Sequence, residues 1–215
     1  MGKSIGRRPI HQSENQTGLE RGKTMREKIL QAIRKNEIQT YSVTEKTTEG
    51  AELYFIKKDL DMRRMKKDAY SEVTIYRDFE MDGKKMRGSA DINIFPEMTQ
   101  EEVDKAVSGA FYAASFVKNP YFEIPKGTKE DKVEVESTLC GKSLEEIGDA
   151  FVKALYCVDV HEDAFINTAE FFMDKTWTAI YNSEGVDVSY EKNSVRGEFV
   201  VQCITPQDVE QYQEF

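Results

Sequence analysis

Asp78-Phe-Glu-Met-Asp-Gly-Lys-Lys85 lies between two runs in which apolar and polar residues alternate. This two-residue period is typical of β-strands that bury one face. At its centre, Asp82-Gly83 readily adopts the positive φ angles that a two-residue hairpin turn requires. We therefore expect antiparallel strands at about 70–79 and 85–95. Gly88, inside the second strand, predicts a bulge or the close approach of another backbone segment.

Two capped helices are expected after this hairpin. Each opens with a capping box, in which a Ser or Thr and the Glu three residues later each bond the other's backbone amide. The first box starts at Thr99 and precedes an apolar stripe that reaches Val117, whose small residues allow close packing on a sheet. The second starts at Ser143 and precedes an apolar face that reaches Val158.

The remaining elements complete the fold prediction. A short helix is expected at 25–36, ahead of the hairpin. Strand patterns recur later in the chain, at 133–135, 165–173, 176–181 and 195–204. Because helices do not alternate strictly with strands, this order predicts an α+β fold. We expect an antiparallel or mixed sheet with the two main capped helices packed on one face.

The domain organisation is predicted from changes in composition. Residues 1–24 are polar and aperiodic, which predicts a disordered leader or a misassigned start ahead of Met25. The α+β domain is expected to span 25–205, and 206–215 to be the truncated start of a following region. Hydrophobic residues make up 39% and charged residues 32% of the chain, a balance that is typical of globular proteins.

The charge of the chain limits its expected partners. Residues 1–24 hold five basic and two acidic side chains, which leaves 25 basic against 37 acidic in the rest. An acidic body repels phosphate groups, so neither nucleic acid nor an anionic membrane surface is an expected partner. No apolar run approaches the ~18 residues that a membrane-spanning helix needs.

The cysteines favour a reducing compartment. Cys140, Cys157 and Cys203 form an odd set without CxxC spacing, which indicates reduced thiols rather than a disulfide framework. We expect all three to be core or strand residues, since free cysteine is among the most buried residue types. No apolar run follows Arg7-Arg8, as it would in a secretory signal, so the predicted location is cytoplasmic.

Residues suited to catalysis are scarce. His161-Glu162 is half of a zinc-binding His-Glu motif, but Phe165 and Ile166 stand where its partner histidine would be. We expect a polar pair in a turn between a helix and a strand. A thiol dyad of Cys157 with His161 remains a third-ranked alternative. The sequence therefore predicts neither catalytic nor metal-binding residues in this chain.

Two stretches contain more polar and small residues than packing demands, Lys84 to Ala90 and Tyr181 to Asp187. Taken alone, the first is explained as an edge strand guarded by charge. The second is explained as a hairpin turn whose Asn and Gly accept positive φ angles.

Taken together, several segments resemble the TldD/PmbA family of zinc metallopeptidases, once described as modulators of DNA gyrase. The resemblance covers about 70–205. It rests on Val73-Thr-Ile-Tyr76, Gly83-Lys-Lys-Met-Arg-Gly-Ser89, the helix at 101–117 with Asn119-Pro-Tyr121, and Tyr181-Asn-Ser-Glu-Gly-Val-Asp-Val188 before the strand at 195–204.

The resemblance implies an N-terminal α+β half of a larger peptidase. In the family, the other half carries a His-Glu-x-x-x-His helix and a further zinc ligand, none of which occurs here. It also implies a homologous subunit as partner, in a homo- or heterodimer, and an extended peptide as substrate. Zinc is then expected outside this chain, and this chain alone is not expected to be an active hydrolase.

The residues expected at a substrate site or subunit interface are Arg87, Gly88, Asn182, Ser183, Glu184 and Gly185. The alternative hypothesis is a stand-alone module without enzymatic activity, which binds a peptide or protein through a sheet edge.

Overall fold

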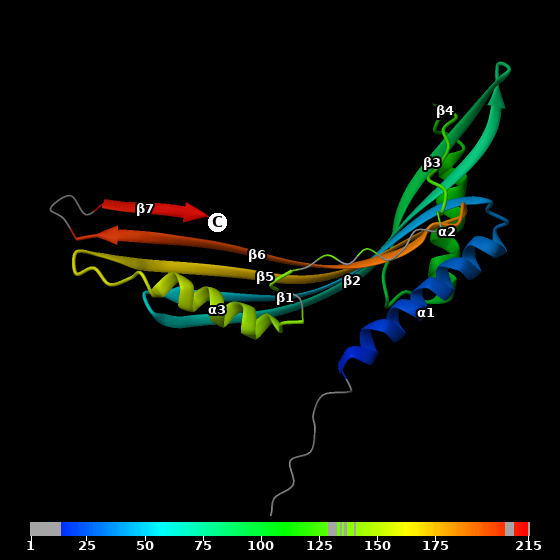
Figure 1. The fold of residues 1–215 in the computed structure, drawn as a ribbon. Coiled ribbons are helices and arrows are strands. Elements are labelled where there is room, and N and C mark those ends of the chain that lie inside the picture. The colour runs from blue at the N-terminus through cyan, green and yellow to red at the C-terminus, as the bar shows by residue number, and fades with distance from the viewer. Residues whose placement is uncertain are drawn as a thin grey trace, which may run out of the picture. The chain divides into compact units, whose positions relative to one another are not determined.

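The structure is a computed structural model that describes residues 14–128, 133, 135, 137–139, 141–204 and 209–214. Three helices and seven strands occur among these residues (Figure 1). In chain order they are α1 (Glu14–Lys35), β1 (Thr40–Ile56), β2 (Asp59–Met81), β3 (Lys84–Ile94), α2 (Gln100–Ala114), β4 (Asn119–Pro120), α3 (Leu144–Tyr156), β5 (Ala164–Asn182), β6 (Asp187–Cys203) and β7 (Val209–Glu214).

The strands form one antiparallel sheet in the order β4-β3-β2-β1-β5-β6-β7. Neighbours in the sheet are mostly neighbours in sequence, which is the arrangement that tight hairpin turns produce. The predicted α+β class is therefore confirmed.

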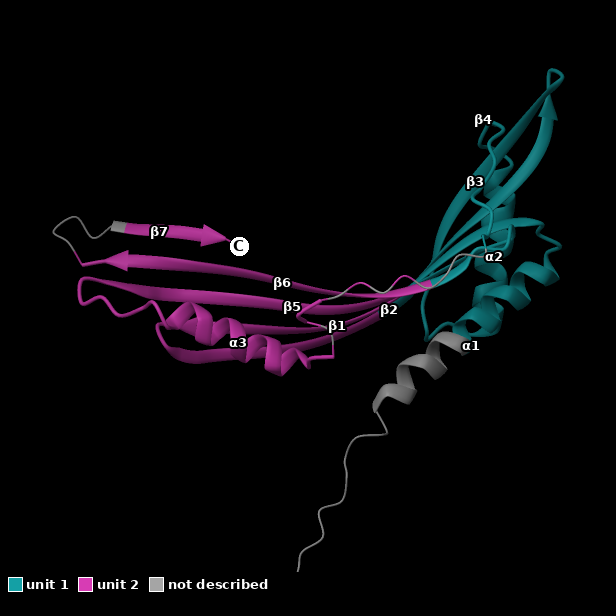
Figure 2. Cartoon of the chain, viewed as in Figure 1, with its two compact units in different colours: residues 1–45, 69–128, 179–188 teal, residues 46–68, 129–178, 189–215 magenta. Residues whose placement is uncertain are grey.

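The chain divides into two compact units (Figure 2). Unit 1 comprises 1–45, 69–128 and 179–188, and unit 2 comprises 46–68, 129–178 and 189–215. Strands β1, β2, β5 and β6 each contribute residues to both units. The single domain expected at 25–205 stays a prediction.

The hairpin between β2 and β3 is confirmed. Met81 pairs with Lys84, so Asp82 and Gly83 alone form the turn. Their φ angles are +52° and +70°, the positive values that a type I′ turn requires at both central residues. The pairing continues without interruption to Ser71 and Ile94.

The core of unit 1 lies between helices α1 and α2 and the strands they cover. Ile29 of α1, Val103 and Val107 of α2 and Ile75 of β2 are fully buried in it. The capping box of α2 is confirmed, with Thr99 and Glu102 bonded to each other's backbone amides.

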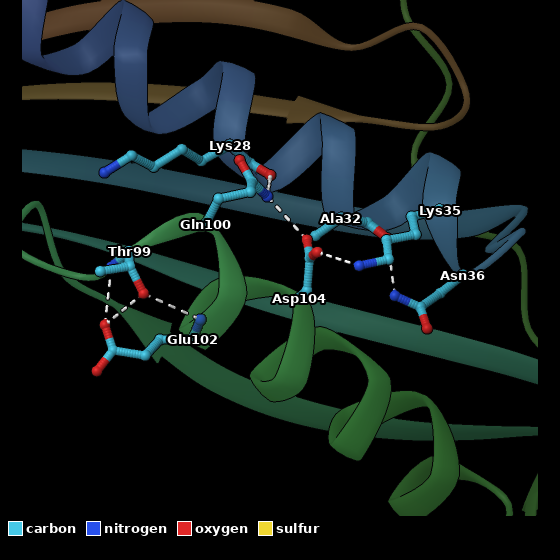
Figure 3. A network of polar contacts seen from close by, with 8 residues as sticks. All are labelled: Lys28, Ala32, Lys35, Asn36, Thr99, Gln100, Glu102 and Asp104. Carbon is cyan, nitrogen blue, oxygen red and sulfur yellow. Dashed lines mark hydrogen bonds and ion pairs between the residues drawn. The ribbon is translucent and has the colours of Figure 1, made fainter.

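Polar contacts join α1 to α2 beside this core (Figure 3). Gln100 donates from Nε2 to the carbonyl oxygen of Lys28 at 3.0 Å and to Asp104 Oδ1 at 2.8 Å. Lys35 Nζ donates to Asp104 Oδ2 at 2.5 Å. One flank of α2 is therefore occupied by α1.

The core of unit 2 forms where α3 packs on β1 and β5. Ile147 of α3 lies among buried Phe55, Phe171 and Met173. The rings of Phe55 and Phe171 meet edge to face, with centroids 6.1 Å apart, a favourable aromatic geometry. The second capping box is also confirmed, between Ser143 and Glu146.

The predicted break between the strands at 165–173 and 176–181 is wrong, because β5 runs from Ala164 to Asn182. Asp174 and Lys175, the two residues between the expected strands, each have an ion-pair partner on another strand. Lys66 lies 3.0 Å from Asp174 and Glu191 lies 3.3 Å from Lys175. Both charged residues of this stretch therefore have ionic partners within the sheet.

Other boundaries also differ from the prediction. Helix α1 begins at Glu14, inside the expected leader at 1–24, while 1–13 lie outside the described residues. Helix α2 ends at Ala114 rather than at Val117. Val133 and Val135 are exposed and lie outside any strand, and 134 is not described. Of the expected terminal region at 206–215, Val209–Glu214 forms β7, paired with β6.

Gly88 is a point of close approach rather than a bulge, since the β2–β3 register passes through it unbroken. A Cβ atom at Gly88 would lie 1.8 Å from the carbonyl oxygen of Ala114 and 2.7 Å from that of Val117. The end of α2 can therefore rest on β3 only because residue 88 has no side chain.

We predict that Gly88→Ala lowers the free energy of unfolding by about 1–3 kcal/mol, because the new methyl group forces α2 away from β3. Gly109→Ala is the control, since nothing lies within 4 Å of its added Cβ. It should raise stability by about 0.5–1 kcal/mol, as Ala does for Gly in a helix. Urea unfolding measures both, and equal effects of the two variants would contradict the close approach.

Candidate functional site

A segment that we call the strap, residues 119–127, connects the two stretches that stood out in the sequence. It begins with β4, whose Asn119 and Pro120 pair with Arg87 and Met86 of β3. Its Ile124 is buried. All the contacts described below for the strap lie within unit 1.

Arg87 holds the first part of the strap. Its side chain is only 5% exposed. It donates two hydrogen bonds to Asp78 of β2, from Nε to Oδ1 at 2.6 Å and from Nη2 to Oδ2 at 2.9 Å. The remaining guanidinium nitrogen, Nη1, donates a hydrogen bond of 2.7 Å to the carbonyl oxygen of Phe122. The guanidinium also lies 4.4 Å from the ring centroid of Tyr121, a cation–π contact.

The electrostatics of this pair follow from its geometry. The hydrogen bonds from Arg87 lower the pKa of Asp78 below its usual value, and burial only partly opposes them. The bonds to Asp78 likewise raise the pKa of Arg87. Both groups are therefore held in their charged forms, as in other bidentate guanidinium–carboxylate pairs.

The turn at 182–185 holds the other end of the strap. Asn182 Nδ2 donates to the carbonyl oxygen of Pro125 at 2.8 Å, and the amide of Gly127 donates to the carbonyl oxygen of Glu184 at 3.0 Å. Gly185 has a φ angle of +86°. A Cβ atom on Gly127 would lie 2.0 Å from the carbonyl oxygen of Gly185, so the strap passes close to the backbone of the turn.

Asn182 also organises the turn itself. Its Oδ1 accepts from the amides of Glu184 at 2.9 Å and Val186 at 3.1 Å. Ser183 forms two hydrogen bonds with Tyr41 at the start of β1. Its Oγ accepts from the Tyr41 amide, and its own amide donates to the Tyr41 carbonyl oxygen. The hairpin turn expected for this stretch is thus confirmed, with the expected positive φ angle at Gly185. The expectation of a positive φ angle at Asn182 is wrong, because this residue contributes through its side chain instead.

The strap therefore contacts both stretches that the sequence singled out. Arg87 and Gly88 lie at its start, and the turn at 182–185 lies at its end. Only Glu184 and Gly185 of these residues are exposed. Their assignment to a substrate site or an interface stays a prediction.

A buried carboxylate, which the sequence reading missed, lies elsewhere in unit 1. Glu45 of β1 is 6% exposed and accepts a hydrogen bond of 3.0 Å from the hydroxyl of Tyr181. Arg26 of α1 covers the Tyr181 ring at 4.1 Å and forms a bidentate pair with Asp187, at 2.7 and 3.1 Å. The sequence signal was available, because Glu45 shares a strand face with buried Val43.

Burial raises the pKa of Glu45 above its usual value, although the bond from Tyr181 and the charge of Arg26 oppose this. Burial and the neighbouring Glu45 raise the pKa of the Tyr181 hydroxyl. The Tyr181 hydroxyl therefore keeps its proton at physiological pH and can donate a hydrogen bond to Glu45.

No hydrogen bond joins Cys157 to His161, the candidate thiol dyad, among the described residues. Cys157 is the exposed C-cap of α3, and its Sγ contacts the carbonyl oxygen of Ala154 at 3.1 Å. The expectation that it is a core or strand residue is wrong, because it follows the last turn of the helix. Cys203 lies in β6 as expected, and Cys140 lies outside the described residues. His161-Glu162 occupies an exposed turn between α3 and β5, as predicted.

No group of three or more His, Cys, Asp or Glu side chains is placed to hold a metal ion in the part of the chain that is described. The described residues therefore do not fit a zinc site. Among these residues, no helix has the length and apolar character needed to cross a membrane.

The same fold occurs in several solved structures. TldE from Thermococcus kodakarensis aligns with 87% of this chain and 42% of its own, at 14% identity and a TM-score of 0.60. A candidate modulator of a DNA gyrase from Thermotoga maritima aligns with 90% of this chain and 42% of its own, at 13% identity and a TM-score of 0.63. A candidate modulator of DNA gyrase from Bacteroides thetaiotaomicron aligns over 90% of this chain and 44% of its own length, at 9% identity and a TM-score of 0.63.

These likenesses establish the fold, and this chain spans less than half the length of each of those proteins. No protein-family model matches the sequence, and no curated protein is similar enough to it to count as a relative. The resemblance expected from the sequence is thus confirmed at the level of the fold.

We predict that Asp78→Asn destabilises the chain at neutral pH but not in strong acid. Because the folded pKa of Asp78 is lowered from 3.8, its contribution is present above that pH and is lost as the pH falls through the folded value. Urea unfolding of both proteins across this range measures the difference. Asp82→Asn, in the exposed turn of the same hairpin, is the matched control and should leave stability at neutral pH close to that of wild type, since Asn also adopts the positive φ angle found there. If the difference in unfolding free energy between wild type and Asp78→Asn stays constant in acid, the ion pair is contradicted.

Glu45→Gln should show the opposite pH dependence. The pKa of Glu45 is raised from 4.5 in the folded chain, so its contribution is most favourable below pH 4.5 and declines as the pH rises through the folded value. Relative to wild type, the variant should therefore gain stability between acidic and neutral pH. Thermal unfolding at several pH values tests this, and a difference independent of pH would show that Glu45 is not buried as described.

Proposed function

We propose that this chain is the N-terminal domain of a TldD/PmbA-type metallopeptidase or of its zinc-less partner subunit. In that role it helps to enclose a peptide substrate and forms part of the subunit interface, in the cytoplasm. The observation that carries the proposal is the fold shared with TldE and two candidate modulators of DNA gyrase over 87–90% of this chain. Hydrolysis then belongs to the whole assembly.

The zinc of such an assembly would be held outside the described residues of this chain, which do not fit it. When bound, zinc supplies a Lewis acid and an activated water molecule for peptide hydrolysis. The contribution of this chain is structural.

Long strands support the role in substrate enclosure. Strands β1, β2, β5 and β6 contain 17, 23, 19 and 17 residues, against about 5–6 in a typical strand. Long antiparallel strands suit this role, because an unfolded peptide can lie along a strand and pair with a free sheet edge.

Exposed aromatic side chains near the end of α2 support the role at an interface. Tyr112 and Phe116 are 67% and 64% exposed, and their rings meet edge to face with centroids 5.0 Å apart. Tyr121 and Phe122 of the strap are also exposed. Aromatic residues are enriched in protein interfaces and costly to leave in water, so this group suits contact with a homologous subunit.

The second candidate is a stand-alone module, without enzymatic activity, that binds a peptide or protein through a sheet edge. The pairing of β4 with only Met86 and Arg87 favours it, because much of β3 then keeps an open edge. Association with a zinc-bearing subunit distinguishes the first proposal from the second.

We predict that the purified chain contains zinc far below one equivalent and does not hydrolyse unfolded casein. With a zinc-bearing TldD/PmbA-type subunit it should form a complex, measured by sedimentation velocity. Tyr112→Asp combined with Phe116→Asp should weaken this complex by at least about tenfold, since charge at an aromatic hot spot is costly. Leu60→Asp, at an exposed position of unit 2, serves as the control.

Zinc-dependent cleavage of casein by the chain alone would overturn the proposal. Failure to associate with any such subunit, while peptides still bind, would favour the stand-alone module instead.

A further inference from the structure

Strand β3 has an open edge beyond its short contact with β4. The pairing with β4 stops at Arg87, while the pairing with β2 on the other side continues to Ile94. From 88 to 94, no strand of the described chain pairs with the outer side of β3. Unpaired backbone groups of this kind can accept a further strand.

A groove runs along this edge, between β3 and α2. It has a volume of about 470 Å³ and is lined by Ala90 and Ile92 of β3 and by Ala106, Gly109 and Ala113 of α2. The α2 residues recur at helical spacing on the flank that α1 does not occupy. Because their side chains are small, the groove stays open beside the strand.

Gly109 has no explanation within the folded chain. A glycine in a helix interior costs roughly 0.5–1 kcal/mol relative to alanine. Nothing lies within 4 Å of a Cβ added there, so no neighbour of the described structure requires its absence. The free space at Gly109 instead suits a side chain that enters the groove from outside.

The rim of the groove is acidic. Asp91 and Glu102 line it together with a single base, Lys105. A second hollow shares Asp91 and Ile92 and adds Glu72. None of these three carboxylates forms an ion pair within the described residues; Asp91 bonds only to Thr74, and Glu102 only to Thr99. The rim therefore favours an occupant with basic residues.

The charge also disfavours a second copy of the chain as the occupant. Symmetric pairing of two β3 edges about the middle of 88–94 would place Asp91 opposite Asp91. Like charges directly opposite each other destabilise a strand pair, and the Glu102 side chains would add to the repulsion.

We propose that the groove between β3 and α2 binds an extended peptide segment flanked by basic residues, which adds to the open edge of β3 as a further strand. Main-chain bonds to β3 supply affinity that does not depend on sequence, and an apolar side chain of the peptide enters the space at Gly109. The inference does not rest on the first proposed function, because the groove would bind such a segment whether or not the chain belongs to a peptidase. It deepens the second candidate function, since it names the groove and the class of peptide that the sheet edge would bind.

The test uses the full chain and a fluorescein-labelled peptide, Lys-Thr-Val-Thr-Val-Thr-Lys, with binding measured by fluorescence anisotropy. Gly109→Leu fills the groove and should weaken binding by at least about tenfold, since it removes the pocket for the buried side chain. Ser108→Leu, at an exposed neighbouring position of α2, should leave affinity within about twofold, because it adds the same bulk outside the groove.

Two altered peptides test the remaining parts of the proposal. Replacing both lysines by glutamates should weaken binding by about tenfold at low salt, because the rim is acidic. Methylating alternate backbone nitrogens should abolish binding if the peptide pairs with β3. Hydrogen exchange of amides in 88–94 should slow on addition of the unmodified peptide and not of the methylated one.

Binding unaffected by Gly109→Leu, or equal affinity for the glutamate peptide, would overturn the proposal. Self-association through β3 without peptide binding would also overturn it, in favour of a dimer edge. Circular dichroism checks that Gly109→Leu is folded. If it is not, Asp91→Lys replaces it, since this exposed substitution reverses the rim charge and should likewise weaken binding of the lysine peptide.

Discussion

The bidentate pair of Arg87 with Asp78 is the interaction on which the arrangement of unit 1 depends. A guanidinium that is almost fully buried is tolerated only when its donors are used, because an unpaired buried charge costs several kcal/mol. Arg87 uses its donors on β2 and on the strap. Its neighbour Gly88 lets the end of α2 rest on the same strand. Two adjacent residues of β3 therefore position a strand, a helix end and a connecting segment.

The same kind of group behaves differently in two places of this unit. Asp78 has a guanidinium partner and partial access to water, which favour the charged form, whereas Glu45 is buried and receives its hydrogen bond from a neutral hydroxyl. Environment rather than residue type thus sets the proton affinity of each carboxyl. Both were unremarkable in the sequence, where acidic residues are numerous.

Features fixed by neighbouring residues could be predicted from the sequence. The turn at Asp82-Gly83 and the capping boxes at Thr99 and Ser143 depend on residues a few positions apart. Features that depend on distant residues could not. The ion pair of Asp174 in β5 with Lys66 in β2 joins residues that are far apart in the chain. The common role of Arg87 and Asn182 emerges only once both are seen to hold the strap. The groove at Gly109 appears only when α2 is placed on β3.

The division of the chain has a consequence for its biosynthesis. Unit 1 takes residues from both early and late parts of the sequence, and its contact between Arg26 and Asp187 spans 161 positions. Helix α1 thus leaves the ribosome long before the strand end that completes its surroundings, so unit 1 cannot fold as a finished N-terminal piece during translation. Long-range closure of this kind slows folding and leaves apolar surface uncovered in the meantime. The core of unit 1, which includes Tyr181 as well as Ile29, is therefore complete only after residue 188 has emerged.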